Sequence, residues 1–424
     1  MEQENLSSKK DRLYNYVRRF CFPRLAGTKG EEKAVRLTIN TFKEIGFSDS
    51  QIKQRSFEFS DFYSTSLIKL LMVINLIFNL ILLLLFYIHV ILTLVLVATM
   101  VIIVFLIFKG LKHPEIRGFW GEYFGNIHTA TNVTVKIPAI NLSDRKTGDI
   151  VVSAHLDSKS QTYKTFWRIA FYRLWLYCGL FQGFFYIIFV LNVFSIVKIN
   201  TRFILYGSWI SVILISISNI FLMFLNTHDN SPGALDNASG MAIVFELSKY
   251  FKSRSLDNLN LWFCQFSAEE LGTMGSRFFV NDHEHEFTKG RIFQLNFDVI
   301  SCANHKLNQI EYFKSYGVFP RKKIAPLLSK YINLAAKIEN IEINGFHLST
   351  GAHTDSVPFH LRGYDAIDIT TRAGALFTHS KEDSLEKVDP EVLLQTFTLF
   401  KKVILMIDKD YNKLCNNENL ICEV

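Results

Sequence analysis

Apolar residues are concentrated in two blocks of the chain, and the rest of the sequence alternates between apolar and polar positions. The first block runs from Leu70 to Phe108 and contains no Lys, Arg, Asp or Glu. Because a membrane-spanning helix needs about 20 apolar residues, this block is long enough for two spans with a tight turn near residues 87–89. The second block, from Leu174 to Leu225, is interrupted at residues 197–202 and predicts two more spans. Buried core helices, the alternative interpretation, are shorter and have polar faces. We therefore expect four transmembrane helices, arranged as two hairpins.

Outside these blocks, strand-like and helix-like patterns follow one another. Residues 31–47 are apolar at every third or fourth position, which predicts an amphipathic helix with Gly46 as its C-cap. The further segments that predict strands are 132–140, 149–158, 259–267, 291–301 and 364–371, and those that predict helices are 241–254, 275–287, 324–338 and 390–407. Apolar strands that alternate with helices are typical of a sheet covered on both faces. We predict an α/β fold with a mixed, mostly parallel sheet sandwiched by helices, plus the four inserted transmembrane helices.

These patterns divide the chain into five segments. One soluble domain is expected to be assembled from residues 1–65, 113–165 and 227–424. The two transmembrane hairpins are expected at residues 66–112 and 166–226.

Composition and charge narrow the classes of function. Hydrophobic residues make up 49% of the 424 residues, which is rich for a soluble protein. The six cysteines contain no CxxC pair, which favours a reducing compartment over a disulfide scaffold. We attribute the net charge of +7 to basic flanks beside anionic lipid. The sequence has no aromatic and basic interleaving or finger spacing, so no nucleic-acid partner is expected, and it is silent on the oligomeric state.

Basic residues flank the predicted hairpins unequally. The turns opposite the soluble side carry only Lys198 and Arg202. The basic residues on the soluble side are Lys69, Lys109, Lys112, Arg117, Lys164, Arg168 and Arg173. The positive-inside rule therefore predicts a multi-pass integral membrane protein with its soluble part in the cytosol. Asn-x-Ser/Thr triplets at Asn132 and Asn141 would suit a lumenal domain, but such triplets often arise by chance.

Histidine and carboxylate residues stand at the ends of the predicted strands, where ligands gather in open α/β sheets. The residues in question are His155 and Asp157, Glu269 and Glu270, Asp298, and His379 in the loop after the strand at 364–371; Asp236 precedes a helix. Singly, such a histidine is usually just hydrogen-bonded, Asp236 could cap a helix and Asp298 could form a turn. Together they predict a metal site of nitrogen and oxygen ligands, which suits zinc. His283 and His285, by contrast, are assigned to an exposed helical face.

The adjacent acids Glu269 and Glu270 follow an apolar strand. Neighbouring residues at a strand end point in different directions, so one carboxylate can bind metal while the other faces a water molecule. A nearby cation offsets their mutual repulsion and acidifies that water. We interpret Glu270 as the ligand and Glu269 as the general base.

The ordered motifs HLD, GALDNASG, AEELGTMGS, NFD and THSKEDSLEKV resemble the co-catalytic di-zinc metallopeptidase family of aminopeptidase Y-like enzymes. Glutamate carboxypeptidases and glutaminyl cyclases are relatives of this family. The resemblance extends over the whole soluble part and includes an opening helix around RLAGTKGEEKAVRLTINTFKEIGF. It implies two zinc ions per chain, one held by His155 and Asp298 and the other by Glu270 and His379. Asp236 would bridge both ions, and Asp157 would orient the imidazole of His155.

One motif departs from the family pattern. Where the family often has Ser-Asp-His-x-Pro-Phe, this chain has HTDSVPFH, with Ser356 in the place of the histidine. A substrate contact made by that histidine is therefore in doubt. His353 and His360 are alternatives, although each is more simply a solvated loop residue.

The sequence thus predicts a membrane-bound zinc metallopeptidase that hydrolyses peptides from the amino end, with Glu269 as the base. The first alternative is an amidohydrolase or glutaminyl cyclase-like enzyme that acts on non-peptide amides. The second is a membrane-bound binding protein with a vestigial site. Because the second hairpin lies between His155 and Asp236 in the sequence, we expect the site to lie near the bilayer. The hairpin would then either favour hydrophobic peptides or serve only as a tether.

Overall fold

The computed structural model describes residues 6–110, 113–117, 124–141, 147–303, 305–306, 308–317, 321–348 and 354–416. The chain folds as two units. The α/β unit comprises Met1–Ser60, Ile127–Ser160 and His228–Val424, and the helical unit comprises Asp61–Asn126 and Gln161–Thr227. The α/β unit is thus built from three separate stretches of sequence, and the helical unit from the two stretches between them.

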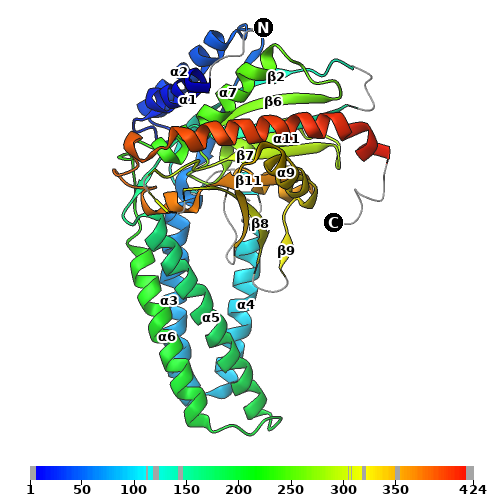
Figure 1. The fold of residues 1–424 in the computed structure, drawn as a ribbon. Helices are drawn as coiled ribbons and strands as arrows, with labels where there is room; N and C mark the ends of the chain where they lie inside the picture. Colours follow the sequence, from blue (N-terminus) through cyan, green and yellow to red (C-terminus); the bar gives the residue numbers. More distant parts are fainter. Residues whose placement is uncertain are drawn as a thin grey trace. The chain divides into compact units, whose positions relative to one another are not determined.

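Within the described residues, nine strands of the α/β unit form one sheet in the order β1-β2-β6-β3-β7-β11-β8-β10, with β9 paired to β8 (Figure 1). The strands are β1 Ile52–Ser60, β2 Ile127–Ile137, β3 Gly148–His155, β6 Leu259–Phe266, β7 Ile292–Phe297, β8 Ile310–Tyr316, β9 Lys322–Lys323, β10 Ile343–Leu348 and β11 Asp365–Thr370. The central strands β6, β3, β7 and β11 are parallel to one another. Strands β1, β2 and β8 add antiparallel pairings at the sides. The carboxyl ends of the four central strands therefore meet at one edge.

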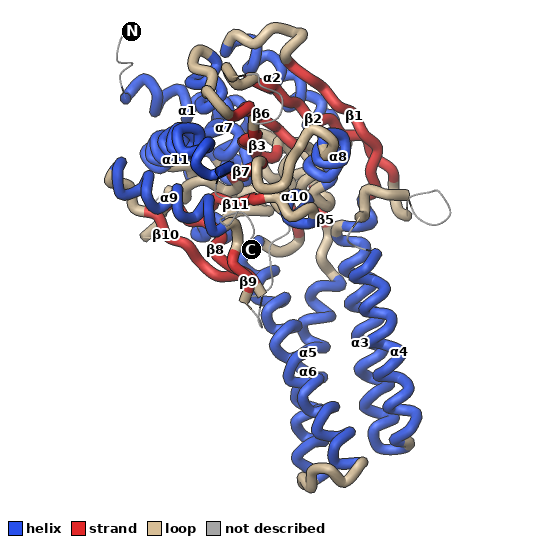
Figure 2. Tube along the Cα trace, turned by 90° about the vertical axis from the view of Figure 1, so that its right-hand side faces the viewer, coloured by secondary structure: helices blue, strands red, loops and turns tan. Residues whose placement is uncertain are grey.

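Helices cover both faces of this sheet, as predicted (Figure 2). The helices on one face are α1 Leu6–Phe20, α2 Lys29–Ile45, α7 Gly240–Lys252, α9 Pro326–Glu339 and α11 Pro390–Asn416; those on the other are α8 Met274–His283 and α10 Val357–Leu361. The predicted C-cap Gly46 ends α2 in the left-handed conformation, with φ at 108°, and its N–H donates to the carbonyl of Lys43. A glycine adopts this conformation without strain.

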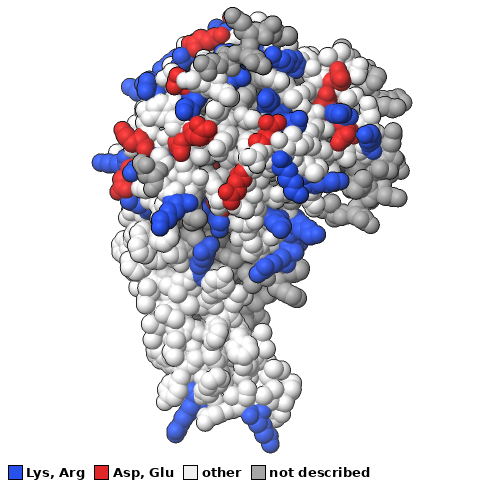
Figure 3. All heavy atoms as spheres, viewed as in Figure 1, with Lys and Arg blue, Asp and Glu red and all other residues white. Residues whose placement is uncertain are grey.

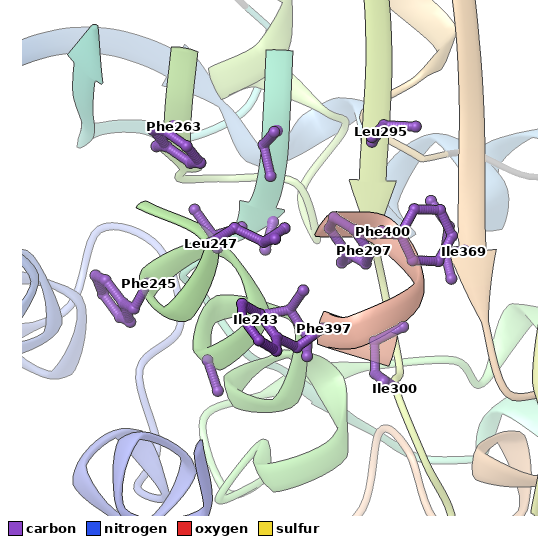
Figure 4. Close-up of a cluster of buried hydrophobic side chains, with 14 of the residues drawn as sticks. Ile243, Phe245, Leu247, Phe263, Leu295, Phe297, Ile300, Ile369, Phe397 and Phe400 are labelled. Carbon is purple, nitrogen blue, oxygen red and sulfur yellow. The ribbon is translucent and has the colours of Figure 1, made fainter. Parts of the chain in front are cut away.

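Two apolar cores lie on opposite faces of the sheet. Along β3, Ile150 and Val152 belong to the larger core, whereas Val151 between them belongs to the smaller one. Such alternation follows from the two-residue period of a strand. Figure 4 shows the larger core, in which side chains of α7 and α11 pack against the strands. Its labelled residues are Ile243, Phe245, Leu247, Phe263, Leu295, Phe297, Ile300, Ile369, Phe397 and Phe400.

The helical unit consists of two hairpins. Its helices are α3 Thr65–Ile88, α4 Val90–Gly110, α5 Thr165–Val193 and α6 Thr201–Met223. His89 is extended and separates α3 from α4, at the predicted turn. Helix α5 begins earlier than the predicted span at Leu174, so Arg168 and Arg173 lie inside its first turns. The short strands β4 Ser160–Gln161 and β5 Thr227–His228 pair where the chain passes between the units.

All four helices of this unit are long and apolar enough to cross a membrane. Their outward positions are apolar, with Leu84, Phe105 and Ile187 each more than half exposed (65%, 66% and 62%). In the view of Figure 3 the surface of these helices carries almost no charged side chains apart from basic ones at one end. Polar residues instead face inward, because Asn79 and Asn219 are buried. This distribution is the one expected of helices that pack in lipid.

Candidate metal centre

The predicted site residues are carried to one edge of the sheet by the strands that precede them. His155 ends β3, the pair Glu269 and Glu270 follows β6, and Asp298 follows β7 directly. His379 follows β11 and the short helix Arg372–Leu376. Asp236 lies in the segment Ala234–Ser239 that leads into α7. Because β6, β3, β7 and β11 are parallel, their ends bring these residues together from distant parts of the sequence.

One group of three ligand residues is centred on the ring of His155. Its Nε2 lies 3.1 Å from Asp236 Oδ1 and 3.3 Å from Asp298 Oδ1. His155 is 1% exposed and Asp236 is 7% exposed, so the group is shielded from bulk water. These three side chains could hold one metal ion.

A second group is centred on the ring of His379 and shares Asp236 with the first. The Nε2 atom of His379 lies 3.2 Å from Asp236 Oδ2 and 3.3 Å from Glu270 Oε2. All three residues are buried, and they could hold a second ion. Asp236 therefore directs one carboxylate oxygen toward each group, the arrangement needed for a carboxylate that bridges two cations.

Asp157 supports the site in a different way from the one expected. The Nδ1 atom of His155 is 3.1 Å from the backbone carbonyl of Asp157, whereas the Asp157 carboxylate is 3.6 Å away, too far for a hydrogen bond. The carboxylate instead accepts the backbone N–H groups of Glu269 and Glu270, both at 3.2 Å. Asp157 thus orients the imidazole through its main chain and fixes the paired acids through its side chain.

The charges of the cluster act on one another strongly. Burial alone would raise the pKa of Asp236, but hydrogen bonds from His155 and His379 hold it well below its usual value. Burial likewise opposes ionisation of Glu270, yet the charges of His379 and Lys159 lower its pKa to about 2. Both shifts favour the ionised carboxylate, which is the form that binds a metal ion.

Glu269 differs from its neighbour. It belongs to neither group of ligands and is 8% exposed. Burial, together with the nearby charges of Glu270 and Asp298, raises the pKa of Glu269 well above its usual value. A carboxyl group with a raised pKa beside a metal site has the property required of a general base that must accept a proton and release it again.

The donor set fits zinc. Each group combines one imidazole nitrogen with carboxylate oxygens, which are common ligands of this ion. Glu270 Oε1 is buried and has no hydrogen-bond partner among the described residues. Four acidic residues are crowded together here, and a buried carboxylate oxygen without a partner is costly. Bound cations would remove both costs.

The contacts of three further residues at the site were not predicted from the sequence. Lys159 is buried, and its Nζ lies 2.8 Å from Glu270 Oε2 and donates to the Glu270 carbonyl. Asp383 accepts the backbone N–H of Leu235 at 2.6 Å and that of Asp236 at 3.1 Å. Arg24 is completely buried. The contacts of these residues could not be predicted from the sequence spacing, because each contact reaches a distant backbone or side-chain group.

The residues of the motif HTDSVPFH, which departs from the family pattern, lie in different environments. Ser356, in the place of the family histidine, donates to Asp368 Oδ2 at 2.6 Å in the interior. His360 lies in α10, and burial lowers its pKa. His353 lies outside the described residues. His283, assigned to a surface role, lies at the end of α8 and pairs with Glu286 at 2.8 Å.

Comparison with known proteins shows which family this site resembles. Residues 222–404 match peptidase family M28. The resemblance found in the sequence is therefore confirmed. Aminopeptidase YwaD of Bacillus subtilis is 29% identical over 172 residues, which cover 39% of this chain and 35% of that enzyme. Leucine aminopeptidase 2 of Trichophyton rubrum is 35% identical over 94 residues, which cover 21% of this chain and 18% of the fungal protein. The matched part thus spans about a third or less of these relatives.

Solved structures share the fold of this chain. A zinc aminopeptidase from Bacillus subtilis superposes with a TM-score of 0.54 at 15% identity, covering 95% of this chain and 96% of that one. A glutaminyl cyclase from an Acidobacteriales bacterium superposes with a TM-score of 0.52 at 15% identity, covering 95% of each chain. The α/β class with a mixed sheet is therefore confirmed. The M28 match begins after His155 and Asp157, and the structure brings these two residues to the matched part.

Proposed function

We propose that this chain is a membrane-bound, zinc-dependent aminopeptidase. His155, Asp236 and Asp298 would hold one zinc ion, and Asp236, Glu270 and His379 would hold the other. The observation that carries the proposal is the position of Asp236, whose two carboxylate oxygens lie 3.1 Å from His155 Nε2 and 3.2 Å from His379 Nε2. The M28 match and the aminopeptidases among the relatives support a peptide substrate.

Each residue of the site would have a separate role in hydrolysis. When bound, the zinc pair would supply Lewis acidity, which lowers the pKa of water and stabilises negative charge on the scissile carbonyl oxygen. Glu269, which is not a ligand, would take the proton from the attacking water and return it to the leaving amine. Asp157 keeps Glu269 in place through the backbone N–H bond at 3.2 Å. The buried site would exclude competing water from these steps.

The helical unit supports attachment to a membrane. Its four helices have the length and composition of spans, and their exposed side chains are apolar. The excess of basic residues near the α/β unit in sequence supports a cytosolic position for that unit. Asn132, a potential glycosylation site, is 1% exposed, and its amide bonds to Gly275 and Ser267. It therefore gives no support for a lumenal position.

Sidedness can be tested with cysteines introduced at Lys198, in the turn between α5 and α6, and at Gln54, which is exposed on β1. An impermeant maleimide applied to intact cells should label the first and spare the second until the membrane is permeabilised. The opposite pattern would place the α/β unit outside the cytosol. Labelling of both sites in intact cells would mean that the helices do not span the membrane.

The activity is tested on the full chain, purified in detergent. We expect hydrolysis of aminoacyl anilides, its loss on treatment with a chelator, and its recovery with Zn²⁺. The same anilides carrying an N-acetyl group should be resistant, because an aminopeptidase requires a free α-amine. Hydrolysis of only the acetylated compounds would indicate an amidohydrolase, and cyclisation of glutaminyl peptides would indicate a cyclase. Fewer than one zinc per chain, without any turnover, would indicate a binding protein with a vestigial site.

A further inference from the structure

Arg24 makes an unusual set of contacts in the interior of the α/β unit. It is 0% exposed, and its guanidinium donates to backbone carbonyls of three separate segments. Nε donates to Leu156 at 2.7 Å, Nη1 to Pro232 at 2.8 Å, and Nη2 to Gly233 at 2.8 Å. Nη1 also donates to the carbonyls of Phe20 and Phe22 in the N-terminal segment. The rigid fork of an arginine can satisfy several acceptors at once in fixed directions.

The acceptors of Arg24 adjoin two of the proposed metal ligands. Leu156 directly follows His155, and Gly233 precedes Asp236 by three residues. In the sequence these two segments are separated by residues 161–227, one of the two stretches that form the helical unit. Arg24 therefore joins the two segments that border this insertion, directly beside the residues expected to share a zinc ion.

The guanidinium of Arg24 can approach this backbone closely because residue 233 is a glycine. Gly233 has a left-handed backbone with φ at 62°, and a Cβ atom placed there would lie 2.7 Å from Arg24 Nη1 and 2.6 Å from Ser158 Cβ. A side chain at this position would displace the guanidinium. Ser158 adds a parallel link, because its hydroxyl accepts the backbone N–H of Arg24 at 3.3 Å and donates to the backbone carbonyl of Ser231 at 3.1 Å.

The segment that carries Asp236 is held at its other end by Asp383. The carboxyl oxygens of Asp383 accept the N–H groups of Leu235 and Asp236 at 2.6 and 3.1 Å. Arg24 thus binds the carbonyls at the start of this segment, and Asp383 binds the amides at its end. Between the two, the backbone that positions the Asp236 carboxylate has few ways to move.

We propose that Arg24 is a positioning residue for the metal pair: it fixes the segment after His155 against the segment before Asp236, and so sets the separation of these two ligands. The proposal rests on the proposed function, because it assigns a role toward the same metals. Residues outside the ligand shell that orient metal ligands typically change metal affinity by about 10–100-fold when they are replaced. We expect a loss of this order at the His155 site when the contacts of Arg24 are broken.

The experiment measures Zn²⁺ affinity on the full chain in detergent, by competition with a chromophoric chelator. Arg24→Gln removes the charge and most donors. Arg24→Lys keeps the charge but cannot reach Leu156 and Gly233 together. Arg12→Gln is the matched control, because it removes the contact of another, partly buried arginine, the hydrogen bond to Glu246 on α7 at 2.8 Å. The Co²⁺-loaded proteins are compared by electron paramagnetic resonance, which reports whether two ions share a ligand.

The expected result is an affinity for one zinc ion that is about 10–100-fold weaker in both Arg24 variants and unchanged in Arg12→Gln. The magnetic coupling of the cobalt pair should weaken in the same two proteins. If Arg24→Gln does not fold, Arg24→Lys decides the question alone. Wild-type affinity in a folded Arg24→Lys protein overturns the proposal, as does an equal loss in Arg12→Gln, which would mark a general loss of stability. If the wild-type chain itself binds no zinc, the proposed function fails, and that outcome is distinct from the others.

Discussion

The rings of His155 and His379 approach opposite oxygens of one carboxylate. His155 Nε2 lies 3.1 Å from Asp236 Oδ1, and His379 Nε2 lies 3.2 Å from Asp236 Oδ2. The two histidines come from different stretches of the α/β unit's sequence, so this relationship exists only in the folded chain. It makes Asp236 the single side chain on which both proposed metal positions depend.

Asp236→Asn should therefore affect both metal positions, whereas Asp298→Asn should affect only the one near His155. We expect the zinc content of Asp236→Asn to fall from two equivalents to fewer than one. Peptidase activity should fall by about 10³-fold, the order of loss seen when one electrostatic stabiliser is removed. Metal analysis after gel filtration checks the content. An Asp236→Asn protein that retains two zinc ions would contradict the shared role of this carboxylate.

Glu269→Gln should separate metal binding from catalysis. Glutamine is close to glutamate in shape but cannot accept the proton of the attacking water, so kcat should fall by about 10²–10⁴-fold. The zinc content should stay at the wild-type value, because Glu269 lies in neither group of ligands. The surface variant Glu286→Gln serves as the control. Loss of zinc from Glu269→Gln would instead indicate that this residue is a ligand.

The parts of the fold that the sequence predicted are those with a strong internal pattern. They include the apolar runs of β3, β6 and β7 and the four long apolar helices. Strand β1 was not predicted, because its side chains at Lys53 to Ser56 are exposed and its sequence alternates weakly. Strands β8 and β10 were not predicted for the same reason. They lie toward the other side of the sheet and carry exposed polar residues.

The candidate site divides in a similar way. His155, Glu270 and Asp298 stand at strand ends, so the parallel order of the strands alone is sufficient to predict that they meet. Arg24 was not predicted, because its contacts are to backbone carbonyls, and any sequence offers carbonyls. The two hydrogen bonds that the Asp157 carboxylate accepts from backbone N–H groups were also not predicted, since they depend on the path of the loop after β6.

Glu31 should make the stability of the α/β unit depend on pH near neutrality. Burial raises its pKa from 4.5 to about 7, although it accepts hydrogen bonds from Thr131 N–H at 3.0 Å and Ser267 Oγ at 2.9 Å. The folded state therefore keeps a proton that the unfolded state has lost. Stability should fall as pH rises from about 4.5 to about 7 and then level off, by about 3 kcal/mol at most.

Glu31→Gln is the variant that isolates this effect. Its side-chain oxygen can still accept both hydrogen bonds, but it does not ionise. Thermal unfolding of the two proteins should differ little at pH 5, and the variant should be the more stable at pH 8. Parallel curves across this range, with a constant difference in the unfolding midpoint, would show that Glu31 does not titrate as described.

Asn75 should hold together three helices of the helical unit. Its Oδ1 accepts Asn219 Nδ2 of α6 at 2.9 Å, Trp175 Nε1 of α5 at 3.4 Å, and Asn79 Nδ2 of its own helix α3 at 3.0 Å. Interhelical hydrogen bonds in membranes contribute about 0.6–2 kcal/mol each. Asn75→Leu should therefore lower the stability of the helical unit by about 1–3 kcal/mol, because it leaves the buried donor of α6 and the partly buried donor of α5 without this acceptor.

A double substitution tests whether the cost comes from the unpaired donors. In Asn75→Leu with Asn219→Leu, both partners of the shortest interhelical bond become apolar, so part of the lost stability should return. Thr99→Val is the control, because Thr99 is exposed on α4 and bonds only to Val95 of its own helix at 2.9 Å. Unfolding in detergent, followed by tryptophan fluorescence, measures the wild type, the two single leucine variants, the double variant and Thr99→Val. If the two leucine substitutions are additive, Asn75 and Asn219 act independently, and the helices must be held by apolar packing instead.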